Sequence, residues 1–259
     1  KYAPSVKIEM ALRDHQAITR TLSELCGLEE VITLPSGGFA DSVFIEDSAV
    51  CIGPLLFLTR PGAPERRNEV NAVRKVFEKV VMSPIFEPNA QLPFAVMECP
   101  SEVPVEMETK MATEPAMIDG GDVLFTGTDI FVGISSRTNM AGCQALGNAV
   151  HKTLTSVLDR PEVIPLPLGA AAAADGILHL KSALTCAGPG VLVTGGGRTG
   201  LKLQETIEGL RPGSYSFLHC PLKDAANVVY VNGILLRRHD DEICVGSRRV
   251  LNSLGGLQI

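Results

Sequence analysis

The sequence predicts an α/β protein in which one structural unit, two strands followed by a helix and a third strand, recurs along the chain. Two observations support this prediction. Short apolar runs occur in pairs that are separated by glycine-containing turns. Each pair is followed by a segment with apolar residues at helical spacing. The 259 residues, of which 45% are hydrophobic, provide enough material for one large globular domain or two small ones.

Four such units begin near Asp41, Gly120, Leu178 and Asn227, an interpretation that rests on the order of elements alone. The chain opens with a helix that ends at Gly27 and a strand at Val31–Leu34, which resemble the tail of a fifth unit. In the fourth unit, a helix ending near Leu254 is not followed by the closing strand that the pattern requires.

The expected elements of the four units follow from periodicity and turn residues. In chain order they are strands at 43–45, 49–52 and 55–59, a helix at 70–80, a hairpin at 123–134, a helix at 140–154, a strand near 163, a hairpin at 178–193, a helix at 203–210, a strand at 215–218 and a hairpin at 228–236. Ser83–Ala116 interrupts this pattern with six prolines and many acids. We expect a long, partly extended excursion there.

Composition excludes several classes of protein. The formal net charge is −6 and no basic run occurs, so nucleic acid and anionic membranes are unsuitable partners. No apolar run reaches the roughly 18 residues of a membrane helix. The seven cysteines are odd in number, scattered, and never arranged as C-x-x-C. This favours reduced thiols in a cytoplasmic protein over a disulfide framework or a metal site.

One hairpin carries more polar chemistry than a core requires. Ile118–Asn139 opens with the acids and glycines of D-G-G-D, at Asp119 to Asp122, and closes with Arg137. Adjacent glycines allow backbone conformations that are closed to other residues, so the side chains of the flanking acids can take orientations that a tight turn would otherwise exclude. Taken alone, such a hairpin is more often a solvated turn.

Further polar motifs stand elsewhere in the chain. Asp41–Asp47 reads D-S-V-F-I-E-D, Arg60 lies in T-R-P-G-A-P, and His179 lies in H-L-K-S. A single histidine beside a strand is more often structural than catalytic. A planar guanidinium ion requires carboxylates in its plane, and a substrate carboxylate is best bound by arginine. The acids and arginines therefore have the composition of a site for a guanidino amino acid.

Long motifs in a fixed order carry a resemblance to a known family. F-I-E-D, T-R-P-G-A-P-E-R-R, D-G-G-D-V-L-F-T-G, S-R-T-N and H-L-K-S together resemble the dimethylarginine dimethylaminohydrolases, of the guanidino-group-modifying superfamily. The resemblance implies a pentein fold, an α/β propeller of repeated modules with pseudo-fivefold symmetry, here incomplete at both ends. It also implies a single domain over residues 1–259, with the Pro-rich excursion at about 83–116.

The resemblance further implies hydrolysis of Nω-methylated arginines to citrulline plus dimethylamine or methylamine, without a cofactor or metal. The partner is then a small-molecule substrate, and the protein a monomer or weak dimer. The site residues carried over from the family are His179 as proton shuttle, Asp119 as orienting acid, Glu46 and Asp47 at the guanidinium, Asp41 at the amino-acid end, and Arg60 and Arg137 at the carboxylate.

The nucleophile of this family is a cysteine near the C-terminus, and we expect it beyond Ile259. Cys186 is the cysteine nearest to His179 in sequence, but seven extended residues at about 3.3 Å each span roughly 23 Å. We interpret Cys186 as a buried apolar thiol. Two alternatives stay open, an inactive methylarginine-binding or regulatory protein and another pentein enzyme such as an arginine deiminase. The length of D-G-G-D-V-L-F-T-G favours the first family.

A glycine-rich motif indicates a competing function. Gly195, Gly197 and Gly200 form G-x-G-x-x-G between a strand and a helix, which is the setting of a dinucleotide site. The acid expected about 20 residues later is absent. We therefore interpret the motif as a glycine-rich helix entry.

Overall fold

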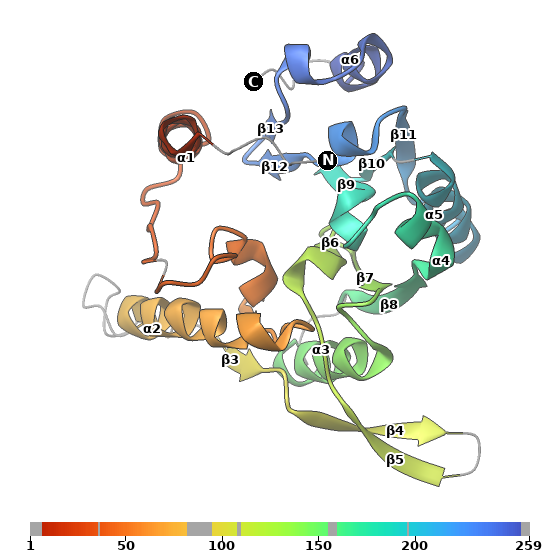
Figure 1. Ribbon diagram of the computed structural model, residues 1–259. Coiled ribbons are helices and arrows are strands. Elements are labelled where there is room, and N and C mark those ends of the chain that lie inside the picture. The colour runs from red at the N-terminus through yellow and green to blue at the C-terminus, as the bar shows by residue number, and fades with distance from the viewer. Residues whose placement is uncertain are drawn as a thin grey trace.

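A computed structural model describes residues 7–35, 37–81, 95–107, 110–154, 160–195 and 197–254. Four modules of the predicted kind follow one another around a common centre, with their helices on the outside (Figure 1). In each module a short 3₁₀ turn, labelled η and here called the opening turn, directly precedes the first strand. Within the described residues, no helix combines the length and apolar character needed to cross a membrane.

The modules share one topology, in which two antiparallel strands are followed by a helix and a third strand parallel to the second. The first contains η1 (Ile45–Ser48), β1 (Ala49–Ile52), β2 (Leu55–Leu58), η2 (Pro64–Glu69), α2 (Val70–Val81) and β3 (Ala95–Glu98). The second contains η3 (Gly120–Asp122), β6 (Val123–Phe125), β7 (Asp129–Ile134), α3 (Met140–Thr153) and β8 (Glu162–Pro167).

The third module contains α4 (Gly169–Ala174), η4 (Leu180–Ser182), β9 (Leu184–Gly188), β10 (Val191–Gly195), α5 (Gly197–Leu210) and β11 (Ser216–Cys220). The fourth contains η5 (Lys223–Ala226), β12 (Val229–Val231), β13 (Ile234–Leu236), η6 (Asp240–Glu242) and α6 (Val245–Asn252). The predicted repeat of two strands, a helix and a strand is therefore confirmed for three complete modules. The fourth is described up to its helix.

The middle strand of each complete module is buried on both faces, because the module's helix covers one side and a neighbouring module the other. All four residues of β2 are buried, as are the first five of β7. Apolar clusters cross the module boundaries: Phe57 of the first module shares a cluster with Ile130 of the second, and Val193 of the third with Val228 of the fourth. That residues 1–259 form one domain remains a prediction, and this packing agrees with it.

The four opening turns position the polar residues. Successive turns contact each other, η1 against η3, η3 against η4 and η4 against η5. The turns therefore gather near the centre of the molecule, although they are separated by tens of residues in the chain. Side chains carried on them converge there without any need for long loops.

Some elements differ from the sequence-based expectation. Val31–Leu34 is extended but pairs with no described strand, so its apolar residues do not form the predicted β-strand. The excursion forms β3 and a hairpin of β4 (Glu102–Met107) and β5 (Lys110–Pro115) that projects from the body (Figure 1). Its residues 83–94 lie outside the described residues. Helix α1 (Ile8–Glu24) has no buried residue, and the segment that follows it is tied to the turn after β12 by a hydrogen bond from Asn232 Nδ2 to the Cys26 carbonyl oxygen, 2.8 Å.

Candidate active site

The paired glycines of D-G-G-D have a steric role. A Cβ on Gly120 would lie 1.9 Å from the Glu46 carbonyl oxygen, and one on Gly121 would lie 2.6 Å from Asp47 Oδ1. Neither glycine has the positive φ that the sequence reasoning invoked. The glycines are required because η1, η3 and η4 pack too closely at this point for any side chain.

His179 immediately precedes η4 and is surrounded by three acids. Its Nδ1 lies 3.4 Å from Asp122 Oδ2, and its Nε2 lies 3.9 Å from both Asp119 Oδ2 and Asp47 Oδ2. Burial of the ring lowers the pKa of His179, but the hydrogen bond to Asp122 and the three negative charges outweigh it. The pKa is therefore raised above its ordinary value of 6.5.

Asp122 is the acid that holds the imidazole, and the sequence reasoning did not single it out. It is fully buried and accepts hydrogen bonds from Ser135 Oγ and Thr138 Oγ1, both 2.7 Å, and from the Leu180 N–H, 2.8 Å. These donors fix the carboxylate beside His179 Nδ1, which is the position of an orienting acid in a catalytic triad. The signal was present in the sequence, since Asp122 is the second acid of D-G-G-D.

Asp119 faces the opposite edge of the imidazole. Its Oδ1 accepts a hydrogen bond from the Gly62 N–H at 2.7 Å, while its buried Oδ2 has no hydrogen-bond partner among the described residues. Burial is the main reason why the pKa of Asp119 is raised, and the nearby charge of Asp47 adds to it. Asp119 therefore lies next to His179, but it faces Nε2, whereas Asp122 faces Nδ1.

Glu46 and Asp47 stand on the same turn and have different surroundings. The Glu46 side chain is 58% exposed and lies 2.7 Å from Lys181 Nζ. Asp47 is buried, with Oδ2 at 2.6 Å from Arg66 Nη1 and Oδ1 accepting from the Gly121 N–H at 2.9 Å. Because Asp47 is held by a buried ion pair, it contributes to folding as well as to the charge of the site.

Of the two arginines that the sequence singled out, the structure brings one to the site. Arg137, in the turn after β7, lines the same cavity as His179 and forms no ion pair with a described residue. A Cβ on Gly62 would lie 2.5 Å from the Arg137 carbonyl oxygen, so the glycine of T-R-P-G permits this approach. Arg60 does not line the cavity; its guanidinium donates to the Ala116 carbonyl oxygen at 2.7 Å. Arg66, in the same motif, does line it.

The cavity in front of His179 has a volume of about 780 Å³. Five of the seven predicted site residues line it, namely Asp41, Glu46, Asp47, Arg137 and His179. Asp119 lies behind them and Arg60 outside. None of the seven cysteines, all of which belong to the described part of the chain, lines this cavity.

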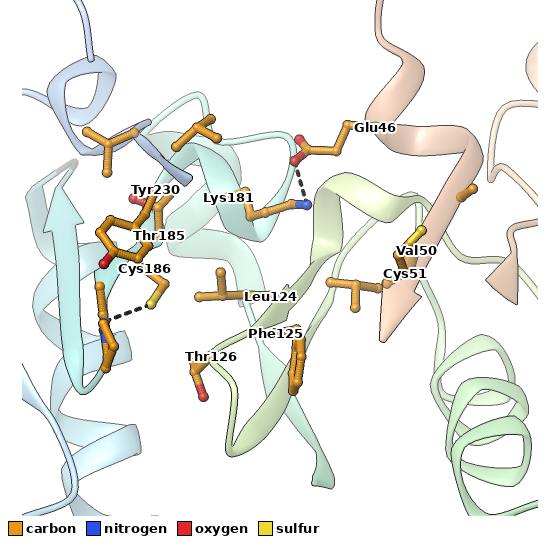
Figure 2. Close-up of a pocket in the computed structure, with 16 residues that line it drawn as sticks. Glu46, Val50, Cys51, Leu124, Phe125, Thr126, Lys181, Thr185, Cys186 and Tyr230 are labelled. Carbon is orange, nitrogen blue, oxygen red and sulfur yellow. Dashed lines mark hydrogen bonds and ion pairs between the residues drawn. The ribbon is translucent and has the colours of Figure 1, made fainter. Parts of the chain in front are cut away.

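A second cavity of about 420 Å³ lies on the other side of the Glu46–Lys181 ion pair, and both residues line both cavities. Figure 2 shows the pair at one edge of this cavity, with Cys186 and Tyr230 on one wall and Cys51 on the opposite wall. The Cys186 thiol donates to the Gly188 carbonyl oxygen, and burial raises its pKa. Cys186 is half-buried and lines this cavity, so it is less enclosed than the buried apolar thiol that the sequence predicted.

Two other kinds of ligand were tested against the geometry. Atoms of Asp47, Asp119 and His179 lie within 4.8 Å of one another, a spacing that suits a divalent cation, although Arg66 already neutralises Asp47. The N-terminus of α5, where the dinucleotide motif stands, is occupied by a carboxylate, because Asp175 Oδ2 accepts from the N–H and hydroxyl of Thr199. A phosphate would be repelled there, so the interpretation of the motif as a helix entry agrees with the structure.

Comparison with known proteins places the chain among guanidino-modifying enzymes. No family model matches it. It is 30% identical over 210 residues to the N(G),N(G)-dimethylarginine dimethylaminohydrolase of Streptomyces coelicolor, and 25% identical over 174 residues to that of Pseudomonas aeruginosa. These alignments cover 80% and 67% of the chain, and the chain spans 62% and 54% of the length of the two enzymes.

Solved structures show the same fold. A dimethylarginine dimethylaminohydrolase from Pseudomonas aeruginosa, complexed with citrulline, has a TM-score of 0.68 at 23% identity, covering 97% of this chain and 80% of that one. An amidinotransferase from Microseira wollei has a TM-score of 0.70 at 17% identity, covering 98% and 77%. At these identities the likeness establishes the pentein architecture and nothing finer.

Proposed function

Since the chain belongs to the dimethylarginine dimethylaminohydrolase family of the pentein superfamily, we propose that the protein hydrolyses the guanidinium C–N bond of Nω-methylated arginines. The products are citrulline and dimethylamine or methylamine. The observation that carries the proposal is the surroundings of His179, an imidazole held by Asp122 with its other nitrogen facing a cavity rich in acids.

The acids and Arg137 define how the substrate lies. Glu46 and Asp47 attract the guanidinium, and the carboxylate oxygens retain lone pairs for it beside their present partners. Arg137 receives the substrate carboxylate, because it is the arginine of the cavity that no acid already neutralises among the described residues, whereas Arg66 is committed to two acids. Asp41, which is exposed at the rim, receives the amino group.

The proposed chemistry uses a cysteine thiolate that attacks the guanidinium carbon. His179, whose pKa is raised by the surrounding acids, donates its Nε2 proton in the imidazolium form to the departing amine. The neutral imidazole then takes a proton from water, which attacks the thiouronium carbon, releases citrulline and regenerates the thiolate. This chemistry requires a cysteine thiol that reaches the cavity, and none of the described cysteines lines it.

The test is citrulline release from asymmetric dimethylarginine by the natural gene product that contains this chain. We expect activity that is lost in His179→Asn, while methylarginine binding, followed by calorimetry, persists. Lys152→Gln, an exposed change on α3, serves as the matched control. Turnover by the His179→Asn variant at the parental rate would refute the assignment.

A binding or regulatory protein is the second candidate, and the cavity without a cysteine favours it. In that case methylarginine binds with the same dependence on Arg137, but no citrulline is released under any condition. An arginine deiminase is the third candidate. An assay with unmethylated arginine distinguishes it from the other two, because a deiminase releases ammonia from arginine.

A further inference from the structure

A separate cavity lies behind the turn that carries Glu46 and Asp47. It has a volume of about 470 Å³ and lies between α2 on one side and residues 34–35 and 37–48 on the other. The only lining residue that it shares with the cavity in front of His179 is Ile45. The proposed substrate site does not use this space, and its volume falls within the range of small-molecule sites.

The walls of this cavity differ in character. The segment before η1 contributes apolar side chains, among them Leu34 and Phe39, and η1 itself contributes Ile45. The ring of Phe39 is packed against Gly37, whose φ is +61° and where a Cβ would lie 3.2 Å from the ring. An apolar body of a ligand would therefore be covered on this side.

Helix α2 contributes the opposite wall through one stripe of residues at helical spacing, which includes Ala72, Lys75, Val76 and Lys79. Val70 and Val73 point away from the cavity into the core beneath. Lys75 and Lys79 are exposed and form no ion pair with a described residue, so both ammonium groups are available at the cavity mouth.

Among the described residues the lining holds one acid, Glu69, which lies 2.9 Å from Arg66, an arginine that Glu69 shares with Asp47. Lys75 and Lys79 therefore place two positive charges, neither paired with a described acid, at one side of an apolar hollow. Ser48, which is 1% exposed, also lines the cavity.

From this arrangement we propose that the cavity is a second ligand site, which binds an organic anion with an apolar body, of the class of medium-chain carboxylates. The apolar body lies between Phe39 and Val76, and the carboxylate lies between the ammonium groups of Lys75 and Lys79. The site is independent of the proposed hydrolase function, because it shares no charged residue with the cavity in front of His179.

Decanoate is the probe, and binding is measured by isothermal titration calorimetry together with chemical-shift changes of the Ser48 and Ala72 amides. We expect saturable binding at one site. The double variant Lys75→Gln/Lys79→Gln should weaken it at least tenfold, because two charge-assisted contacts are lost. Ala72→Phe should abolish it by filling the cavity.

The controls separate this site from the rest of the molecule. Lys152→Gln, an exposed lysine on α3, and Arg137→Gln, in the cavity in front of His179, should bind decanoate as the parent does. Decanol, which has the same chain without the charge, should bind at least tenfold more weakly than decanoate. The proposal is overturned if the double lysine variant binds like the parent, if decanol equals decanoate, or if Arg137→Gln alone removes binding. Because both lysines are exposed, the double variant is expected to fold, which a thermal unfolding curve verifies.

Discussion

Replacing each acid of D-G-G-D by its amide should give opposite results, although the two residues are three positions apart. Asp122→Asn removes the charge from a carboxylate that accepts three short hydrogen bonds, from Ser135, Thr138 and Leu180. A hydrogen bond to a charged acceptor contributes roughly 1.5–3 kcal/mol and a neutral one about 1 kcal/mol. Losing about 1 kcal/mol at each of three bonds lowers the free energy of unfolding by about 3 kcal/mol.

The same change should alter His179. The hydrogen bond to Asp122 is the largest of the effects that raise the pKa of His179, so Asp122→Asn should lower that pKa towards the value that burial alone would give. The amide would also present a donor to Nδ1 and stabilise the wrong tautomer for catalysis. In serine proteases this loss reduces kcat by a factor of about 10⁴.

Asp119→Asn is the matched control. Its Oδ2 has no hydrogen-bond partner among the described residues, and burial already raises the pKa of the carboxyl, so removing the charge should leave the free energy of unfolding unchanged or raise it. The assays are urea unfolding at pH 7 and titration of His179 by NMR. If Asp119→Asn lowers the pKa of His179 more than Asp122→Asn does, Asp119 is the orienting acid and the reasoning from the structure fails.

Three further outcomes follow from named contacts. His179→Gln should destabilise the protein most below about pH 6.5 and progressively less as the pH rises. The folded-state pKa of His179 lies above 6.5, so the stability that the protonated ring contributes is lost as the pH rises through that pKa. The free energy of unfolding, measured from pH 5 to 9, checks this. Gly120→Ala should cost about 3 kcal/mol or more, since its Cβ would meet the Glu46 carbonyl oxygen, and an unfolding free energy within 1 kcal/mol of the parent would contradict the packing. Arg66→Met should lower the unfolding free energy by about 3–5 kcal/mol, because two buried carboxylates lose their partner; a double variant that also replaces both acids by amides should recover part of it.

Much of the architecture was accessible from the sequence because it is encoded locally. Paired apolar runs, glycine turns and helical spacing identified α1, α2, α3, α5 and both strands of each central hairpin. Prediction was weaker for strands whose formation depends on a neighbouring strand elsewhere in the chain. Val31–Leu34 has the composition of a strand, but a strand requires a neighbour to pair its backbone, and the described residues provide none.

The sequence by itself determined which motifs to expect at one site, because residue type and order in D-G-G-D, F-I-E-D and H-L-K-S resemble those of one family. Only the tertiary structure decided which member of each motif lies where around His179. Asp119 and Asp122 are equivalent in a motif, but η3 directs Asp122 to Nδ1 of His179 and Asp119 to Nε2. Likewise Arg60 is held by the Ala116 carbonyl oxygen, while η2 carries Arg66 to Asp47. These choices depend on how neighbouring modules pack at their opening turns, and local sequence does not specify which distant segments come together there.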